Sequence, residues 1–273
     1  MTSLKTVLSI AGSDPSGGAG IQADLKTFTV LGVYGTAIPT NLTVQNTMGV
    51  QASYPVASKL VGDQISCVLS DLDISHIKIG MIGTQAIAEA IVCALETFTG
   101  EIILDPVMHA SDGSKLTEAL GPVAKLAQIA SVLTPNFTEL CTLSNCIPNS
   151  VENSIEACRS LWGCFPQLRC IVCKGGHFQD GNSTVTDHLL IKNGPGDAEH
   201  FAQSHPRVAS INTHGTGCTY ASAFAAYHQQ SGDYVDAFRK SSTFVYQLLR
   251  ASAPLHTGMG RGGMIHHLHI TSS

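Results

Sequence analysis

The chain has 273 residues, of which 44% are hydrophobic and only 13% charged, and its formal net charge is -5. This composition excludes a disordered chain and a coiled coil, and the absence of lysine- or arginine-rich clusters argues against nucleic-acid binding. A chain of this length can form one large α/β domain or two smaller ones. Because we find neither a linker nor an internal repeat, we expect one domain over residues 1–273.

The N-terminal segment predicts no export signal, since only six mostly apolar residues separate Lys5 from Gly12. No segment is apolar for long enough to span a membrane. The nine cysteines are an odd number, which we interpret as reduced thiols in a cytoplasmic protein. Cys170 and Cys173 belong to an apolar run that is typical of a buried strand. Residues three apart on a strand point to opposite faces, so this pair should not bind a metal together.

Short apolar runs alternate with helical patterns along most of the chain. We expect strands at 7–11, 34–42, 77–79, 101–104, 131–133 and 168–173, and helices at 21–28, 60–72 and 87–98. This alternation predicts a mainly parallel sheet with helices on both faces.

The last third of the chain has a different pattern. Residues 181–210 are rich in Asn, Gly, Thr, Ser and Pro, and we expect antiparallel edge strands there. Residues 219–227 are apolar on all sides, which predicts a buried helix. Asp233 is the expected N-cap of a final long helix. The tail contains His266, His267 and His269 without a matching set of metal ligands, so we expect a surface tail rather than a zinc site.

In an open parallel sheet, ligands bind beyond the carboxyl ends of the strands. The residues that follow the predicted strands include glycine-rich loops, an amide, two carboxylates, a lysine and a cysteine. They are the loop 12–20, Gln45, Met81, Asp105, Glu139, Lys174 and the segment 212–219. Backbone amides for oxyanions, carboxylates for Mg²⁺ and a cation are what phosphoryl transfer requires.

Several of these features also have a purely structural interpretation. The loop 12–20 lacks both the Walker A and the Gly-x-Gly-x-x-Gly spacing, and taken alone it is a turn before a helix. Asp24 lies near the apolar face of the first helix, so its carboxylate belongs either in the core or in a pocket. Asn136 and Glu139 have the spacing of a capping box, and Lys174 is followed by a glycine turn.

The segment His214–Thr219 is the strongest single feature of the sequence. Glycines directly before an apolar helix let backbone N–H groups converge on an anion at the positive end of the helix dipole. A thiol at this position is expected to have a lowered pKa, so that Cys218 would be a thiolate near neutral pH. The alternative is a buried cysteine at a tight helix start.

Taken together, these motifs resemble those of the hydroxymethylpyrimidine/phosphomethylpyrimidine kinases of thiamin biosynthesis, members of the ribokinase-like superfamily that are related to pyridoxal kinases. The resemblance covers residues 7–269. The segments that carry it are 11–26, 45–47, 78–81, 104–108, 134–136 with Glu139, 174–177 and 212–219.

The resemblance implies a three-layer α/β/α sandwich with a mainly parallel sheet and a small antiparallel edge or lid, assembled as a homodimer. It implies MgATP-dependent phosphorylation of 4-amino-5-hydroxymethyl-2-methylpyrimidine and then of its monophosphate. The implied site residues are Gly215, Thr216 and Gly217 for an anion hole, Cys218 and Lys174 for catalysis, Asp105 and Glu139 for ATP and Mg²⁺, and Gly12, Asp24, Gln45 and Met81 for the pyrimidine. Cys218 stands where most superfamily members have an aspartate base.

Two segments depart from the family pattern. Residues 39–41 are Pro-Thr-Asn instead of a small apolar stretch, and residues 109–113 lose a lysine near the expected nucleotide and gain an acid.

Two other functions remain open at this point. One is a pyridoxal kinase, because both substrates are flat nitrogen heterocycles that carry a hydroxymethyl group. The other is a non-catalytic vitamin-binding protein, which would be expected to lose Lys174, Asp105 or the glycines.

Overall fold

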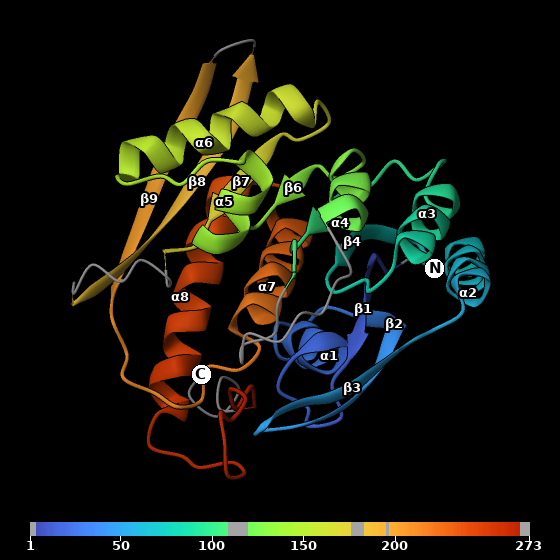
Figure 1. Ribbon diagram of the computed structural model, residues 1–273, viewed down its shortest axis with the longest axis horizontal. Helices are drawn as coiled ribbons and strands as arrows, with labels where there is room; N and C mark the ends of the chain where they lie inside the picture. Colours follow the sequence, from blue (N-terminus) through green and yellow to red (C-terminus); the bar gives the residue numbers. More distant parts are fainter. Residues whose placement is uncertain (1–3, 109–119, 176–182, 195–196, 268–273) are drawn as a thin grey trace.

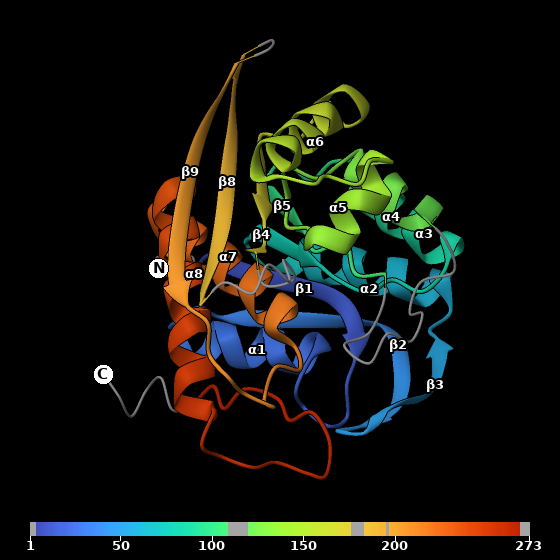
Figure 2. The same cartoon turned by 60° about the vertical axis from the view of Figure 1, so that its left-hand side comes forward.

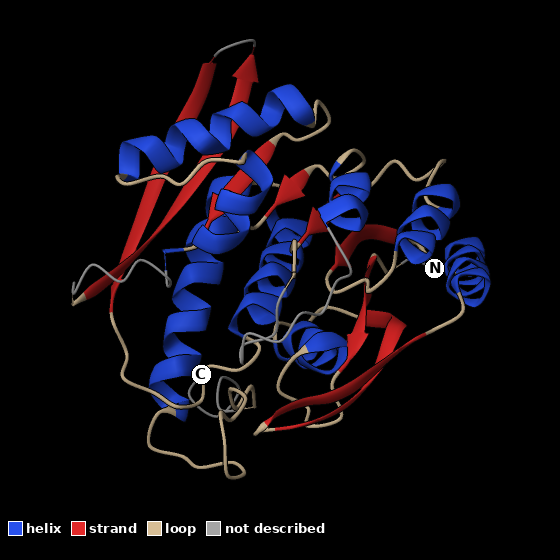
Figure 3. Ribbon diagram, viewed as in Figure 1, coloured by secondary structure: helices blue, strands red, loops and turns tan. Residues whose placement is uncertain are grey.

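A computed structural model describes residues 4–108, 120–175, 183–194 and 197–267. Strands and helices alternate through most of the chain, as the sequence predicted (Figure 3). The strands are β1 (Thr6–Ser13), β2 (Gly35–Asn46), β3 (Gly49–Pro55), β4 (Ile74–Ile79), β5 (Glu101–Leu104), β6 (Val132–Leu133), β7 (Cys170–Cys173), β8 (Thr184–Gly194) and β9 (Asp197–Pro206). The helices are α1 (Gly20–Val30), α2 (Ser58–Asp71), α3 (Gln85–Ala94), α4 (Leu120–Ala127), α5 (Phe137–Ser144), α6 (Val151–Cys164), α7 (Thr216–Ser231) and α8 (Tyr234–Ser252).

The strands form one sheet in the order β3-β2-β1-β4-β5-β6-β7-β8-β9 (Figure 1). The segment from β2 to β7 in this order is parallel, while β8 and β9 pair antiparallel, as expected for the Gly- and Asn-rich segment. The antiparallel strand β3 at the other edge was not predicted. It pairs with β2 through a two-residue connection, so that both edges of the sheet are antiparallel hairpins.

Helices cover both faces of the sheet and make three layers (Figure 2). One face packs against α2, α3, α4, α5 and α6, and the other against α1, α7 and α8. Cys170 belongs to the second core and Cys173 to the first, which confirms that the two sulfurs point to opposite faces of β7. The three-layer arrangement implied by the resemblance is therefore confirmed. Among the described helices, none is both long and apolar enough to cross a membrane.

His266, near the end of the described chain, is more buried than we expected. The prediction of a surface tail was wrong for His266, whose Nε2 lies 3.1 Å from the Oγ1 of Thr219 at the start of α7. Burial lowers the pKa of His266 to about 4, so the imidazole is neutral and can be accommodated in the interior. His267 is exposed as expected, and His269 lies outside the described residues.

A fully buried ion pair joins four elements beneath the carboxyl ends of the strands. Lys78 of β4 donates to both carboxylate oxygens of Asp24 on α1, at 3.0 and 2.9 Å. Asp24 also accepts hydrogen bonds from Ser9 of β1 and from Ser222 of α7. Burial alone would lower the pKa of Lys78, but the Asp24 carboxylate raises it above its ordinary value. The ammonium therefore stays charged in the core.

We expect Lys78→Met to lower the free energy of unfolding by about 3–5 kcal/mol, because it leaves the Asp24 carboxylate buried without its cation. Urea denaturation followed by circular dichroism measures this loss. The matched control is Lys59→Met, since Lys59 pairs with Asp63 on the exposed face of α2, where such pairs contribute about 0.3–0.5 kcal/mol. Equal effects of the two substitutions would contradict the structural importance of the buried pair.

Candidate active site

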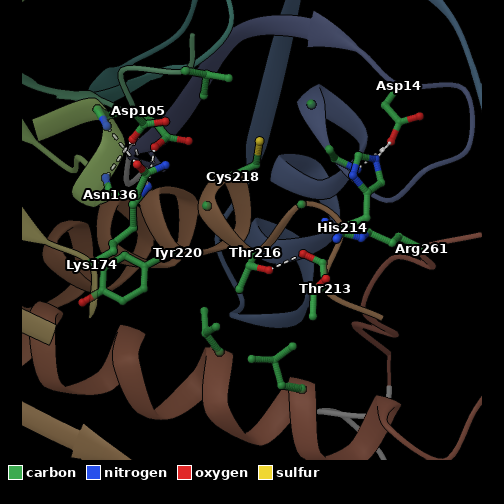
Figure 4. A pocket seen from close by; sticks show the side chains of 18 of the residues that line it. Asp14, Asp105, Asn136, Lys174, Thr213, His214, Thr216, Cys218, Tyr220 and Arg261 are labelled. Atoms are coloured by element: carbon green, nitrogen blue, oxygen red, sulfur yellow. Dashed lines mark hydrogen bonds and ion pairs between the residues drawn. The ribbon is translucent and has the colours of Figure 1, made fainter. Parts of the chain in front are cut away.

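A cavity of about 800 Å³ lies at the carboxyl ends of the central strands. Figure 4 shows side chains from the segments that follow β1, β5 and β7, and from the start of α7, around it. Ten of the residues implied by the sequence line the cavity: Gly12, Gln45, Met81, Asp105, Glu139, Lys174, Gly215, Thr216, Gly217 and Cys218. They meet there because the ends of parallel strands share one edge of the sheet.

Asp24 is the exception, and its implied place in the pyrimidine pocket was wrong. Its side chain is fully buried and does not line the cavity. The reason is its bond to Lys78, which satisfies the carboxylate inside the core. The position of Asp24 on the apolar face of α1 allowed this outcome, but the sequence could not identify Lys78 as its partner.

The polar residues at 39–41, which depart from the family pattern, form hydrogen bonds inside the protein. Thr40 is buried, and its Oγ1 donates to the carbonyl oxygen of Met81 at 2.6 Å. Asn41 is also buried and contacts the hydroxyl of Ser53 on β3. The bond from Thr40 ties β2 to the loop after β4, which carries Met81 into the cavity, while the contact of Asn41 joins β2 to β3. The other departure, at residues 109–113, lies outside the described residues.

The start of α7 lines the cavity. The segment just before it packs closely against the glycine-rich loop after β1. Gly215 has a φ of 78°, a conformation that favours glycine, and a Cβ at this position would collide with the carbonyl of Gly18. A Cβ on Gly217 would lie 3.3 Å from the Lys174 ammonium. The first N–H groups of a helix lack partners within the helix, and the glycine at 217 lets this first turn of α7 lie close to that cation.

Lys174 is held between two carboxylates at the end of β7. Its Nζ lies 2.8 Å from the Oδ1 of Asp105 and 4.0 Å from the Oε2 of Glu139. Burial alone would lower the pKa of Lys174, but these carboxylates raise it. Burial raises the pKa of Glu139 to about 7, although Lys174 acts in the opposite direction. The cluster therefore carries a permanent cation and a carboxyl group that exchanges its proton near neutral pH.

Glu139 serves two purposes in the structure. It completes a capping box with Asn136 at the start of α5, where each side chain bonds to the other residue's backbone N–H. The predicted capping box is therefore confirmed. The same carboxylate also lines the cavity beside Lys174. Glu139 can therefore cap α5 and still present its carboxylate to the cavity.

The carboxylates of this cluster fit a divalent cation held jointly with a phosphate. The Oδ2 of Asp105 is buried, and it has no hydrogen-bond partner among the described residues. Those residues contain no group of three or more His, Cys, Asp or Glu side chains arranged for a metal. Mg²⁺ is commonly bound by only one or two carboxylates, with substrate phosphates and water completing its shell. An oxygen without a partner at Asp105 matches that requirement.

The expectation of a thiolate at Cys218 was wrong for this structure. Burial raises the pKa of Cys218 to about 11; Lys78 opposes this, while Asp24 and Asp105 add to it. The positive end of the α7 dipole was the basis of the expectation. The loss of water around the sulfur and the neighbouring carboxylates outweigh it, so Cys218 is a thiol at neutral pH.

Some cavity residues were not singled out from the sequence. Asp14 and His214 form a hydrogen-bonded pair, with Nε2 and Oδ2 2.8 Å apart. They belong to glycine-rich loops that were recognised, but loop sequences do not indicate which side chains meet. At the sheet edge, His205 and Tyr246 stack with ring centroids 4.7 Å apart. Asp187 accepts hydrogen bonds from the N–H of Gly175 and from a serine hydroxyl on α8. These residues carried no recognisable sequence signal.

Comparison with known proteins identifies the family that the sequence motifs resemble. The family model of phosphomethylpyrimidine kinase matches residues 14–264. The chain is 38% identical to the hydroxymethylpyrimidine/phosphomethylpyrimidine kinase of Escherichia coli, covering 96% of this chain and 97% of that protein. It is also 38% identical to a thiamine biosynthesis bifunctional protein of Geobacter sulfurreducens, but it spans only 51% of that longer relative.

The fold is also similar to solved structures. An ADP complex of the Bacillus subtilis pyridoxal kinase superimposes with a TM-score of 0.84 at 27% identity, covering 97% of this chain and 98% of the other.

The raised pKa of Cys218 can be tested by alkylation. At pH 8, iodoacetamide should modify Cys218 about 10²-fold more slowly than a small free thiol, because only the thiolate reacts. The rate should keep rising about tenfold per pH unit to beyond pH 10. Quantitative mass spectrometry of the Cys218 peptide measures it, and the exposed Cys67 reports that the reagent is active. A plateau reached by pH 8 would contradict the raised pKa.

Proposed function

Because the chain belongs to the phosphomethylpyrimidine kinase family, we propose that it phosphorylates 4-amino-5-hydroxymethyl-2-methylpyrimidine and then the resulting monophosphate, in thiamin biosynthesis. ATP is the phosphoryl donor. The observation that supports this assignment best is the position of the Lys174–Asp105 pair against the glycines of α7, inside a cavity that also contains an amide able to bind the ring.

The two ends of the cavity suit two different ligands. Figure 4 shows Lys174 and Asp105 at one side, Asp14 and His214 at the other, and Cys218 between them. The cation and the carboxylates suit the phosphates of ATP with Mg²⁺. The opposite side, with His214 and the neighbouring Gln45, suits a polar ring such as a pyrimidine. Cys218 then lies where the hydroxymethyl group meets the terminal phosphate.

We assign the transfer itself mainly to positioning and charge. The acceptor oxygen forms a bond to the γ-phosphorus while the bond to the leaving oxygen of ADP breaks. Lys174 and the N–H groups of Gly215, Thr216 and Gly217 stabilise the negative charge on the transferring group. Asp105 and Glu139 would hold Mg²⁺, which when bound would neutralise part of the charge on the phosphates.

The first step also releases a proton, because the acceptor is an alcohol. We assign the proton to Cys218, which accepts it when the sulfur is ionised. With a pKa of about 11, only a small fraction of the enzyme has an ionised Cys218 at neutral pH. In the second step the acceptor is a phosphate oxygen, which is already ionised above a pH of about 6, so no base is needed.

The chain's similarity to a pyridoxal kinase structure makes pyridoxal the alternative acceptor. Pyridoxal is likewise a flat nitrogen heterocycle with a hydroxymethyl group. A non-catalytic vitamin-binding protein is not supported, because Lys174, Asp105 and the glycines of α7 are all present and assembled. We therefore retain pyridoxal phosphorylation as the second candidate.

We further propose a single domain and a homodimer, located in the cytoplasm. One sheet includes all the described strands. The edge hairpin of β2 and β3 exposes Leu42, Val44 and Tyr54, with Met48 at its turn, and these apolar side chains suit contact with a second copy. All nine cysteines are free, as expected in a reducing compartment.

The function is tested by an ATP-coupled assay with hydroxymethylpyrimidine, its monophosphate and pyridoxal supplied separately. We expect turnover of the two pyrimidines to exceed that of pyridoxal. Lys174→Met should lower turnover of every acceptor by roughly 10²-fold or more, because the charge of the transferring group loses its cation.

The control for this substitution is Lys125→Met, on the exposed face of α4, which should leave turnover unchanged. Circular dichroism checks that Lys174→Met remains folded. Preferential turnover of pyridoxal would favour the alternative substrate, and near-normal turnover in Lys174→Met would remove Lys174 from the site.

The role of Cys218 predicts different pH profiles for the two steps. For hydroxymethylpyrimidine, kcat/KM should rise about tenfold per unit between pH 7 and 9, because more of the sulfur is ionised. For the monophosphate it should be nearly flat. Cys218→Ala should lower the first step by about 10²–10⁴-fold and remove its pH dependence, with a much smaller effect on the second. Equal losses in both steps would leave Cys218 as a positioning residue.

A further inference from the structure

In the cavity, the Nε2 atom of His214 has one neighbour that needs a hydrogen-bond donor and another that needs an acceptor. The Nε2 of His214 lies 2.8 Å from the Oδ2 of Asp14 and 3.0 Å from the Nε2 of Gln45. All three residues line the cavity, and Figure 4 shows Asp14 and His214 at the side opposite Lys174. The amide nitrogen of Gln45 can only donate a hydrogen bond, and an ionised carboxylate can only accept one. A neutral imidazole nitrogen can do only one of the two.

Asp14 determines which requirement is met. Its Oδ1 accepts from the N–H and the hydroxyl of Ser16, and its Oδ2 accepts from the N–H groups of Gly18 and Ala19 at 3.1 and 2.8 Å. Although burial acts to raise the pKa of Asp14, the hydrogen bonds from His214 and Ser16 lower it. The carboxylate is therefore ionised at neutral pH, and it holds a proton on the Nε2 of His214 through a charge-assisted hydrogen bond.

Gln45 is the partner that can adapt. Turning its carboxamide by 180° places its oxygen toward the Nε2–H of His214 and its nitrogen toward the Oγ1 of Thr43, which is now 3.3 Å from the amide oxygen. Thr43 already donates its own proton to the carbonyl of Ser13 at 2.8 Å, so its hydroxyl oxygen is able to accept. In this orientation the single Nε2–H of His214 is shared between Asp14 and the oxygen of Gln45, the nitrogen of Gln45 donates to Thr43, and one N–H of Gln45 is left for a ligand.

We propose that the Asp14–His214 pair is a positioning unit that turns the Gln45 amide so that its N–H faces the acceptor ring. The site then favours a heteroaromatic ring that offers a nitrogen lone pair, such as an aminopyrimidine. Asp14 and His214 need not touch the ring to exert this effect. This inference deepens the proposed function and rests on it for the identity of the ring.

The first test measures the protonation of His214 in the wild-type protein without any ligand. Long-range ¹H–¹⁵N spectra of histidine-labelled protein distinguish the two ring nitrogens, and His214→Gln identifies the signals by their loss. We expect Nε2 to carry a proton at pH 7. An unprotonated Nε2 would overturn the inference, whether or not the protein is a pyrimidine kinase.

The second test is a double-mutant cycle on the affinity for hydroxymethylpyrimidine, measured by calorimetry without ATP. The variants are His214→Phe, Gln45→Leu and the pair together. Each single substitution should weaken binding about tenfold, as expected for one lost hydrogen bond. The double variant should bind no more weakly than Gln45→Leu alone, because His214 acts through Gln45.

His214→Gln provides the conservative comparison, since its amide can still donate to Asp14 and present an acceptor or donor to Gln45. It should bind the pyrimidine more tightly than His214→Phe. Additive losses in the cycle, about 10²-fold in the double variant, would contradict the coupling. If wild-type protein binds no pyrimidine at all, the proposed function fails, and the protonation of His214 still decides the inference.

Discussion

The buried contact between Lys78 and Asp24 is the interaction on which the site depends. It lies beneath the cavity and joins β1, α1, β4 and α7 through one ammonium, one carboxylate and two serine hydroxyls. A charge in a protein interior requires a partner, so this pair fixes how the two halves of the parallel sheet and two helices on one face meet. The glycine-rich loop after β1, the loop after β4 and the start of α7 belong to these elements, whereas Asp105 and Lys174 follow β5 and β7.

The same pair contributes to the electrostatics of the cavity above it. The Lys78 ammonium favours ionisation of Cys218, whereas burial and two carboxylates oppose it. Lys174 is held at the cavity surface by Asp105 and Glu139. Lys78 is thus sealed in the core, while Lys174 lines the cavity. Although the chain has few charged residues, Lys174, Asp105 and Glu139 place three ionisable groups together at the cavity.

Glycines allow the loops of the site to approach one another closely. Gly215, the N-cap of α7, has its backbone against the carbonyl of Gly18, where no side chain would fit. The two loops come from β1 and from the segment before α7, some 200 residues apart in the chain. Asp14 and His214 then connect them by a hydrogen bond. Close backbone approach, rather than a sequence-local motif, brings the side chains at this end of the cavity together.

The sequence by itself determined the alternation of strands and helices, the antiparallel hairpin of β8 and β9, the buried helix α7 and ten of the residues that line the cavity. These features follow from hydrophobic periodicity and from residues at strand ends, which are local patterns. Only the tertiary structure decided that Asp24 is a core residue, that His266 is buried, that Cys218 is a thiol and that Asp14 meets His214. Each of these depends on partners distant in sequence and on the loss of water around charged groups, and a linear pattern specifies neither.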